Sequence, residues 1–131
     1  MGTQKIKLVL PELSYQIVGC AFDVHNELGG GHHEKYYQRA LAEAFKVRKI
    51  AFIEQAYYPL NYRGKTVGKQ FVDFIVDSKV VVEIKKGYRF SKRHIDQILG
   101  YLKASKLSLA ILINFGREAV SFKRVVNFSY S

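Results

Sequence analysis

The stretch FVDFIVDSKVVVEIK, residues 71–85, decides the fold of this 131-residue chain. Its two nearly continuous apolar runs, 71–76 and 80–85, are typical of strands that are covered on both faces in the middle of a sheet. The polar residues between the runs indicate a short hairpin loop. The stretch therefore predicts two adjacent central strands, and the charged residues inside them, Asp73, Glu83 and Lys85, call for an explanation.

The length of the loop fixes how these two strands pair. With a loop formed by residues 77–79, the predicted cross-strand pairs are Val76 with Val80, Asp73 with Glu83, and Phe71 with Lys85. Directly opposed residues have Cβ atoms about 5 Å apart, so the two acids become neighbours. A two-residue loop would instead place Asp73 opposite Ile84, on the wrong face.

Two opposed carboxylates on a buried face repel each other, and each costs several kcal/mol to take out of water unless something compensates its charge. A divalent cation would do so, and hard carboxylate oxygens without Cys or clustered His suit Mg²⁺ or Mn²⁺ better than zinc. Lys85 lies on the same face as Glu83, where its ammonium can meet a phosphate or help to activate water. The alternative is an ordinary buried polar cluster in which Lys85 bridges one of the acids.

The rest of the chain reads as helices and strands around this pair. The periodicity predicts helices over Pro11–Leu28, about His33–Arg48, and from an N-cap at Ser91 to about Ser105, and strands over about 52–62, 67–76, 80–85, 107–115 and 119–128. The first three strands are expected to form an antiparallel meander, and the strand after the third helix to run parallel to a neighbour. The fold class is therefore α/β or α+β with a mixed sheet, in one domain over 1–131 with a tail at 1–10.

The composition points to an anionic partner. The formal net charge is +10, from 21 Lys and Arg against 11 Asp and Glu. A strongly cationic surface attracts polyanions, of which nucleic acid is the leading candidate, although charge alone also fits an ordinary basic soluble protein.

The single cysteine, Cys20, excludes an internal disulfide and a Cys-based zinc cage, and its place on the apolar side of the first helix indicates a core residue. A reducing compartment, the cytoplasm, is the expected location. The longest apolar stretch, 107–115, is far shorter than the roughly 18 residues of a membrane span, and no secretory signal is recognisable near the N-terminus. No membrane association is expected.

A basic and aromatic segment follows the third strand, at residues 85–93. Its cations are expected to hold phosphates and an aromatic side chain to stack on an unpaired base: the residues assigned this role are Lys86, Tyr88, Arg89, Lys92 and Arg93. The alternative is a solvated loop whose aromatics, Tyr88 and Phe90, turn into the core. The turn Arg63-Gly64-Lys65, ending near Lys69, is a weaker second candidate, and no groove-reading helix is recognisable.

An acid on one strand followed by Glu-x-Lys on the next resembles the motif of the PD-(D/E)XK nuclease superfamily. More narrowly, GHHEKYY at 31–37 is similar to the pattern that names the small bacterial GxxExxY proteins. The resemblance runs from about Leu13 to Phe128 and includes QILGY at 97–101 and LINFG at 112–116. Val72 departs from the Pro of the motif, a substitution that the superfamily commonly tolerates.

This resemblance implies a restriction-endonuclease-like core and a set of site residues. Metal ligands would be Asp73, Glu83 and Glu34, and Lys85 would be the catalytic lysine. Gln97 and Tyr101, four residues apart on one helix face, would position substrate or a ligand, Gln97 as part of the catalytic set and Tyr101 in contact with nucleic acid. The alternatives are a capping acid for Glu34 and a polar stripe over the sheet edge for Gln97 and Tyr101.

The four histidines lack the spacing of a zinc site and are expected to lie in exposed loops: His25, His32, His33 and His94. The leading expectation is a Mg²⁺- or Mn²⁺-dependent endo- or exodeoxyribonuclease, with DNA ahead of RNA as substrate and a homodimer as the form that would act on two strands. The competing hypotheses are a non-catalytic nucleic-acid-binding module with a nuclease fold and a basic scaffold that binds protein.

Overall fold

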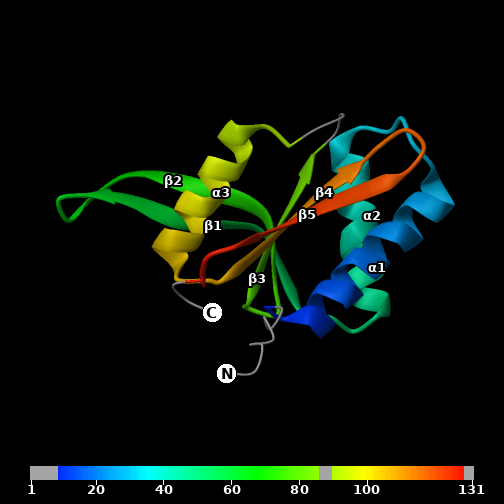
Figure 1. Ribbon diagram of the computed structural model, residues 1–131, viewed down its shortest axis with the longest axis horizontal. Helices are drawn as coiled ribbons and strands as arrows, with labels where there is room; N and C mark the ends of the chain where they lie inside the picture. The colour runs from blue at the N-terminus through cyan, green and yellow to red at the C-terminus, as the bar shows by residue number, and fades with distance from the viewer. Residues whose placement is uncertain (1–8, 86–89, 129–131) are drawn as a thin grey trace, which may run out of the picture.

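The computed structural model describes residues 9–85 and 90–128 (Figure 1). The elements are α1 (Pro11–Leu28), α2 (Glu34–Val47), β1 (Phe52–Tyr62), β2 (Lys65–Val76), β3 (Val80–Lys85), α3 (Lys92–Ser105), β4 (Leu109–Phe115) and β5 (Val120–Val126). This is the predicted order. Boundaries differ by at most two residues, as at β2, which begins at Lys65, and β4, which begins at Leu109. Among the described helices, none combines the length and apolar character that a bilayer span requires.

The five strands form one mixed sheet in the order β1-β2-β3-β4-β5. β1, β2 and β3 form the predicted antiparallel meander. β4 lies parallel to β3, because α3 carries the chain back across the sheet between them, and β5 pairs antiparallel with β4. β3 is therefore a central strand, which explains why its sequence is apolar on both sides.

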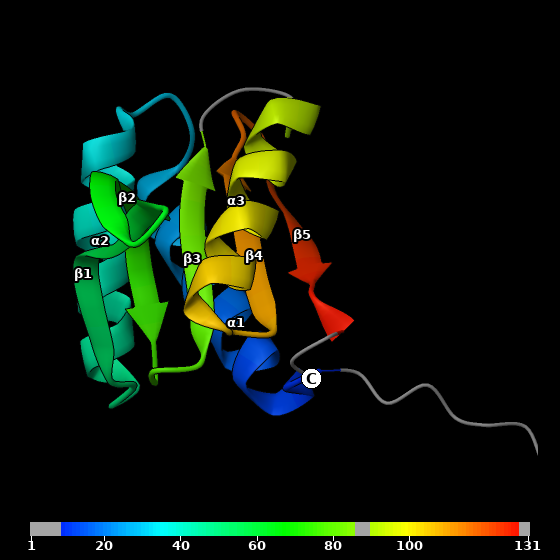
Figure 2. The ribbon, with the colours of Figure 1, turned by 90° about the vertical axis from the view of Figure 1, so that its left-hand side faces the viewer.

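Helices cover both faces of the sheet, with α1 and α2 on one side and α3 on the other (Figure 2). Alternate residues of β3 separate the two cores: Val82 and Ile84 pack toward α1 and α2, and Val81 packs toward α3. By the same alternation, Glu83 and Lys85 belong to the row that faces α3. The acid and the lysine therefore share the α3 side of the sheet.

The loop between β2 and β3 has the predicted length. Asp77 and Ser78 adopt positive φ angles of 53° and 56°, and Val76 pairs with Val80. The ladder between the two strands ends at the pair Phe74–Val82. The predicted pairs of Asp73 with Glu83 and of Phe71 with Lys85 are not part of it, because β2 diverges from β3 beyond Phe74.

Aromatic packing fixes the start of α2 near the carboxyl end of β4. Tyr37 stacks on Phe115 with 4.4 Å between ring centroids, and its hydroxyl donates a hydrogen bond to the Gly29 carbonyl at 2.6 Å. Since β3 and β4 are parallel, their carboxyl ends lie at the same edge of the sheet. Glu34, the first residue of α2, is thereby held at the edge where Glu83 and Lys85 lie.

Cys20 is confirmed as a core residue of α1. It is fully buried, and burial raises the pKa of its thiol to about 11. A thiol with this pKa stays neutral at physiological pH and is a poor nucleophile.

Candidate active site

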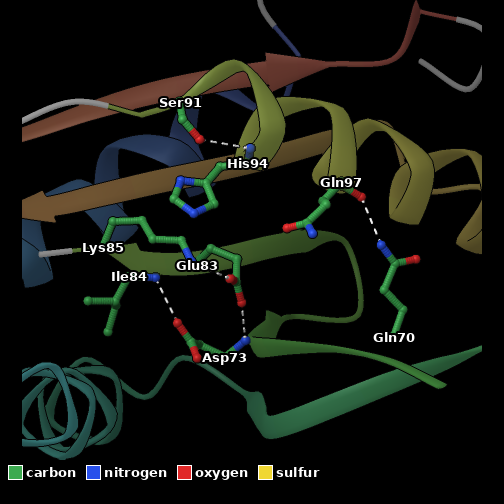
Figure 3. Close-up of polar contacts among 8 residues, drawn as sticks. All are labelled: Gln70, Asp73, Glu83, Ile84, Lys85, Ser91, His94 and Gln97. Atoms are coloured by element: carbon green, nitrogen blue, oxygen red, sulfur yellow. Dashed lines mark hydrogen bonds and ion pairs between the residues drawn. The ribbon is translucent and has the colours of Figure 1, made fainter.

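Asp73 and Glu83 are linked through each other's main chains (Figure 3). The Asp73 N–H donates to Glu83 Oε1 at 2.6 Å, and the Ile84 N–H donates to Asp73 Oδ2 at 2.8 Å. These bonds begin where the ladder between β2 and β3 ends, so side-chain carboxylates replace the carbonyls that would otherwise accept. The two acids therefore lie side by side on adjacent strands, as predicted, but they meet through these bonds and do not form a ladder pair.

Lys85 and Glu34 add one charge of each sign to this pair. Lys85 Nζ lies 3.8 Å from Glu83 Oε2, and the two side chains are 28% and 14% exposed. Glu34 is more exposed, but its charge raises the pKa of both Asp73 and Glu83. The structure thus places all four residues within electrostatic reach of one another.

The pair of acids is costly to ionise. Burial, followed by the charge of Asp73, raises the pKa of Glu83 to about 7, against the opposing effects of the Asp73 N–H and Lys85. Burial also raises the pKa of Asp73, opposed by the Ile84 N–H and the Lys85 charge. Near neutral pH the Glu83 carboxyl is therefore only partly ionised, which is the behaviour of a carboxylate pair that lacks a cation.

Gln55 of β1 is a further member of the site. Its side chain hydrogen-bonds to Asp73 and so favours the ionised carboxylate. Gln55 has a φ of 48° within a strand, and no pairing joins it to Asp73 although the flanking pairs Glu54–Phe74 and Ala56–Val72 form. At this irregularity the side chains of β2 change the face toward which they point. Phe74 and Val72 are two residues apart and would share a face in a regular strand, but Phe74 packs toward α1 and α2 and Val72 packs toward α3. Nothing in the sequence marks Gln55, since its role depends on this local break.

A pocket of about 230 Å³ lies between the divergent part of β2, the end of β3, and α3. The residues that line it are Lys69, Gln70, Phe71, Val72, Glu83, Lys85, His94, Gln97, Ile98 and Tyr101. Asp73 lies beside this pocket, bonded to Glu83, and is not part of its wall. Four consecutive residues of β2 line the pocket, which is possible because this part of β2 no longer pairs with β3.

Several buried polar atoms around the pocket have no partner among the described residues. Two belong to its lining, His94 Nδ1 and the Tyr101 hydroxyl, and a third, Asn114 Oδ1, lies on β4 in the residue that pairs with Lys85. Buried polar groups are usually hydrogen-bonded, so a cluster of unsatisfied ones beside a pocket indicates a place for a polar ligand.

The prediction that the four histidines lie in exposed loops is wrong for two of them. His25 is on α1, where its Nε2 lies 2.8 Å from the Gly116 carbonyl. His94 is in the first turn of α3, half-buried, and burial together with the positive charges of Lys85 and Arg93 lowers its pKa. His32 and His33 do lie exposed between α1 and α2. Sequence spacing missed His94 because only the packing of α3 over β3 turns it toward the site.

Gln97 and Tyr101 both reach the pocket, in different ways. The Gln97 side chain extends from α3 toward Glu83 (Figure 3), while its carbonyl accepts a hydrogen bond from Gln70 Nε2 at 3.0 Å. Tyr101 is fully buried, and burial raises the pKa of its hydroxyl. Its ring is therefore part of the core and offers no face to a base, and its buried hydroxyl has no partner among the described residues.

The basic segment is described in part. Lys86, Tyr88 and Arg89 lie outside the described residues. Lys92 and Arg93 are exposed in the first turn of α3, which contains no acid, and the Ser91 side chain caps the helix by accepting from the His94 N–H. Two cations at a positive helix end favour an anion there. Phe90 packs against the core on the α3 side of the sheet, which agrees with the alternative that the aromatic side chains of this segment turn into the core.

The donor set at Asp73 and Glu83 fits a hard dication. Both offer carboxylate oxygens, burial makes their charges hard to sustain without a counter-ion, and Lys85 supplies a single positive charge to the two acids. Within residues 9–85 and 90–128, no three His, Cys, Asp or Glu residues are grouped closely enough to hold a metal. Glu34 acts on the pair through its charge, and its role as a third ligand stays a prediction.

Comparison with known proteins identifies the superfamily of this chain. A family model of the PD-(D/E)XK nuclease superfamily matches residues 11–125, and the chain belongs to this superfamily. Its restriction-endonuclease-like fold accounts for the mixed sheet.

One solved structure with a similar fold is described as the crystal structure of SSO0001. It has 18% sequence identity and a TM-score of 0.55, over 71% of this chain and 49% of that chain. At this identity the likeness concerns the fold alone, and the chain spans about half the length of that protein. No curated protein gives a significant sequence match.

Proposed function

We propose that this protein is a nuclease dependent on Mg²⁺ or Mn²⁺ that hydrolyses phosphodiester bonds of nucleic acid, with DNA as the expected substrate, and that it belongs to the GxxExxY group of its superfamily. The observation that carries the proposal is the reciprocal bonding of Asp73 and Glu83 beside Lys85. Superfamily membership and the basic surface support it.

Asp73, Glu83 and Lys85 have different roles in the proposed hydrolysis. Asp73 and Glu83 would hold the metal, which when bound supplies Lewis acidity for the phosphate and the water. The Lys85 ammonium is placed to hold a phosphate oxygen and to orient the attacking water. The water oxygen bonds to phosphorus, the ester P–O bond breaks, and the water's proton passes to solvent while the departing oxygen gains one.

A second candidate is a non-catalytic nucleic-acid-binding module that keeps the nuclease fold. It is favoured by one observation: in the part of the chain that the structure describes, Glu34 does not join Asp73 and Glu83 in a three-carboxylate cluster. Such a module would bind nucleic acid with strong salt dependence and without metal.

One assay separates the two. Single-stranded, duplex and branched DNA and RNA are incubated with the pure protein in Mg²⁺, Mn²⁺ or chelator, and both cleavage and mobility shift are followed. Metal-dependent cleavage that disappears in Glu83→Gln supports the nuclease. A shift without cleavage under every condition supports the binding module, and neither signal at moderate salt would overturn both.

A further inference from the structure

The hairpin of β1 and β2 extends past α3 as an arm with two different faces (Figure 1). One face packs on α3: Tyr58 contacts Tyr101 edge-on, and Gln70 bonds to the Gln97 carbonyl. The residues that alternate with these point to the other face, where no helix covers them in the described structure. This uncovered face carries the cross-strand pair Tyr57 and Phe71.

Tyr57, Phe71 and Lys69 form a compact surface group, the hairpin platform. The two rings are 52% and 55% exposed, lie with centroids 5.7 Å apart, and are tilted by 48°. Lys69 Nζ sits 4.6 Å from the centre of the Tyr57 ring. Two large rings side by side in water expose apolar area that a partner would cover, so the platform is a candidate interaction surface.

Charge identifies the kind of partner. Residues 55–72 contain three cations, Arg63, Lys65 and Lys69, and no acid. A surface of rings and cations without carboxylates is suited to a chain that has both flat π-faces and negative charges, which is the combination found in unpaired nucleic acid. Paired bases are stacked inside a duplex and offer their faces only at ends and breaks.

The platform is continuous with the candidate active site. Lys69 and Phe71 also line the pocket that contains Glu83 and Lys85. A strand whose phosphate lies in the pocket would therefore pass next to Lys69 and Phe71 of the platform.

We propose that the hairpin platform binds an unpaired base of the strand whose phosphate enters the pocket, so that single-stranded nucleic acid, or a single-stranded end or flap, is the bound form. The proposal rests on the proposed function for the identity of the pocket's contents, but the binding itself is measurable without cleavage.

The test measures the affinity of the whole chain, in chelator, for a labelled single-stranded oligodeoxythymidylate, a duplex, and an abasic strand of equal length and charge. We expect tighter binding of the oligodeoxythymidylate than of the duplex, and a loss of about 5- to 100-fold in Tyr57→Ala and in Phe71→Ala. Binding of the abasic strand should fall much less than that of the oligodeoxythymidylate in both variants, and Tyr57→Phe should lose far less affinity than Tyr57→Ala. Tyr15→Ala, at a 77% exposed tyrosine on α1, is the matched control.

A spectroscopic readout makes the test independent of folding effects. The chain has no tryptophan, so Phe71→Trp introduces a single indole whose fluorescence a stacked base should quench, whereas Tyr15→Trp should respond little. Equal affinities of Tyr57→Ala, Phe71→Ala and the wild type, or an unquenched Phe71→Trp at saturation, would overturn the platform. A wild-type dimer that becomes monomeric in Phe71→Ala would also overturn it, in favour of a second copy of the chain. If binding depends on Tyr57 and Phe71 but no substrate is cleaved, the nuclease function is rejected and the proposed binding role of the platform is kept.

Discussion

Asp73 and Glu83 each accept a hydrogen bond from a main-chain N–H on the strand that carries the other. The bonds hold both carboxylates at the point where β2 and β3 separate, so each acid helps to position the other. Removal of one side chain therefore affects both the charge of the site and its geometry. A neutral isostere that keeps the acceptor oxygen separates the two effects.

The raised pKa of Glu83 predicts how stability depends on pH. Its ordinary value is 4.5 and its value in the folded protein is about 7, so the folded state binds a proton that the unfolded state has lost. As pH rises from 4.5 through 7, this group makes folding progressively less favourable. Without metal, the free energy of unfolding of the wild type should fall relative to Glu83→Gln by on the order of 1–3 kcal/mol between pH 4.5 and 8.

Urea unfolding at a series of pH values, followed by circular dichroism in chelator, measures this difference. Glu118→Gln, at an exposed glutamate in the β4–β5 turn, serves as the control and should track the wild type. Parallel curves for the wild type and Glu83→Gln would contradict the assigned environment of Glu83.

Divalent metal should stabilise the wild type. A cation bound at tenfold above its Kd adds about 1.4 kcal/mol to the free energy of unfolding and raises Tm by about 5 °C for a chain of this size. The increase should be larger at pH 8 than at pH 6, because Glu83 must lose its proton to act as a ligand. Thermal scans with Mg²⁺ or Mn²⁺ test this, and an equal increase in Asp73→Asn and Glu83→Gln would place the metal elsewhere.

Lys85→Ala should lower cleavage by at least about 100-fold while the protein stays folded, since the side chain is partly exposed and its main role is electrostatic. Lys85 also lowers the pKa of Glu83, so the variant must be assayed at pH 8.5 as well as at pH 7. Recovery at the higher pH would mean that Lys85 acts only through Glu83. Lys103→Ala, on an exposed position of α3, is the matched control, and full activity of Lys85→Ala at both pH values would refute the mechanism.

Gln55→Gly should separate stability from activity. Glycine adopts a φ of 48° without the Cβ penalty, so Tm should be maintained or raised, whereas Asp73 loses the amide that favours its ionised form. Metal affinity, measured by titration of Tm, should fall. Gln55→Ala, which loses the amide but keeps the Cβ, should be the less stable of the two variants; the reverse order would argue against strain at this position.

Gly30→Ala should be strongly destabilising, by more than about 2 kcal/mol, because a Cβ there would collide with main-chain atoms of Arg117 in the β4–β5 turn. The contact holds the loop that leads into Glu34. Gly100→Ala, where an added Cβ meets no atom, should have the opposite sign and stabilise α3 by about 1 kcal/mol. Denaturant midpoints of the two variants provide the comparison.

Much of the fold was predictable because it depends on local patterns. Apolar residues at three- and four-residue steps defined the helices, and the loop of Asp77, Ser78 and Lys79 defined the register that brings Asp73 to Glu83. The predicted direct pairings of Asp73 with Glu83 and of Phe71 with Lys85 were wrong, because the register was assumed to continue past Phe74. The break at Gln55 and the departure of β2 from β3 end that register.

The sequence by itself determined that two acids and a lysine meet on central strands. Side-chain direction alternates along a strand, and the length of the loop fixes the register between the two strands. The tertiary structure decided what surrounds them. His94 and Tyr101 reach the site only because α3 packs over β3 and β4. The hairpin platform exists only because α3 covers one face of the β1–β2 arm and leaves the other open. Such contacts join residues far apart in the chain, and local periodicity has no information about which surface a helix will cover.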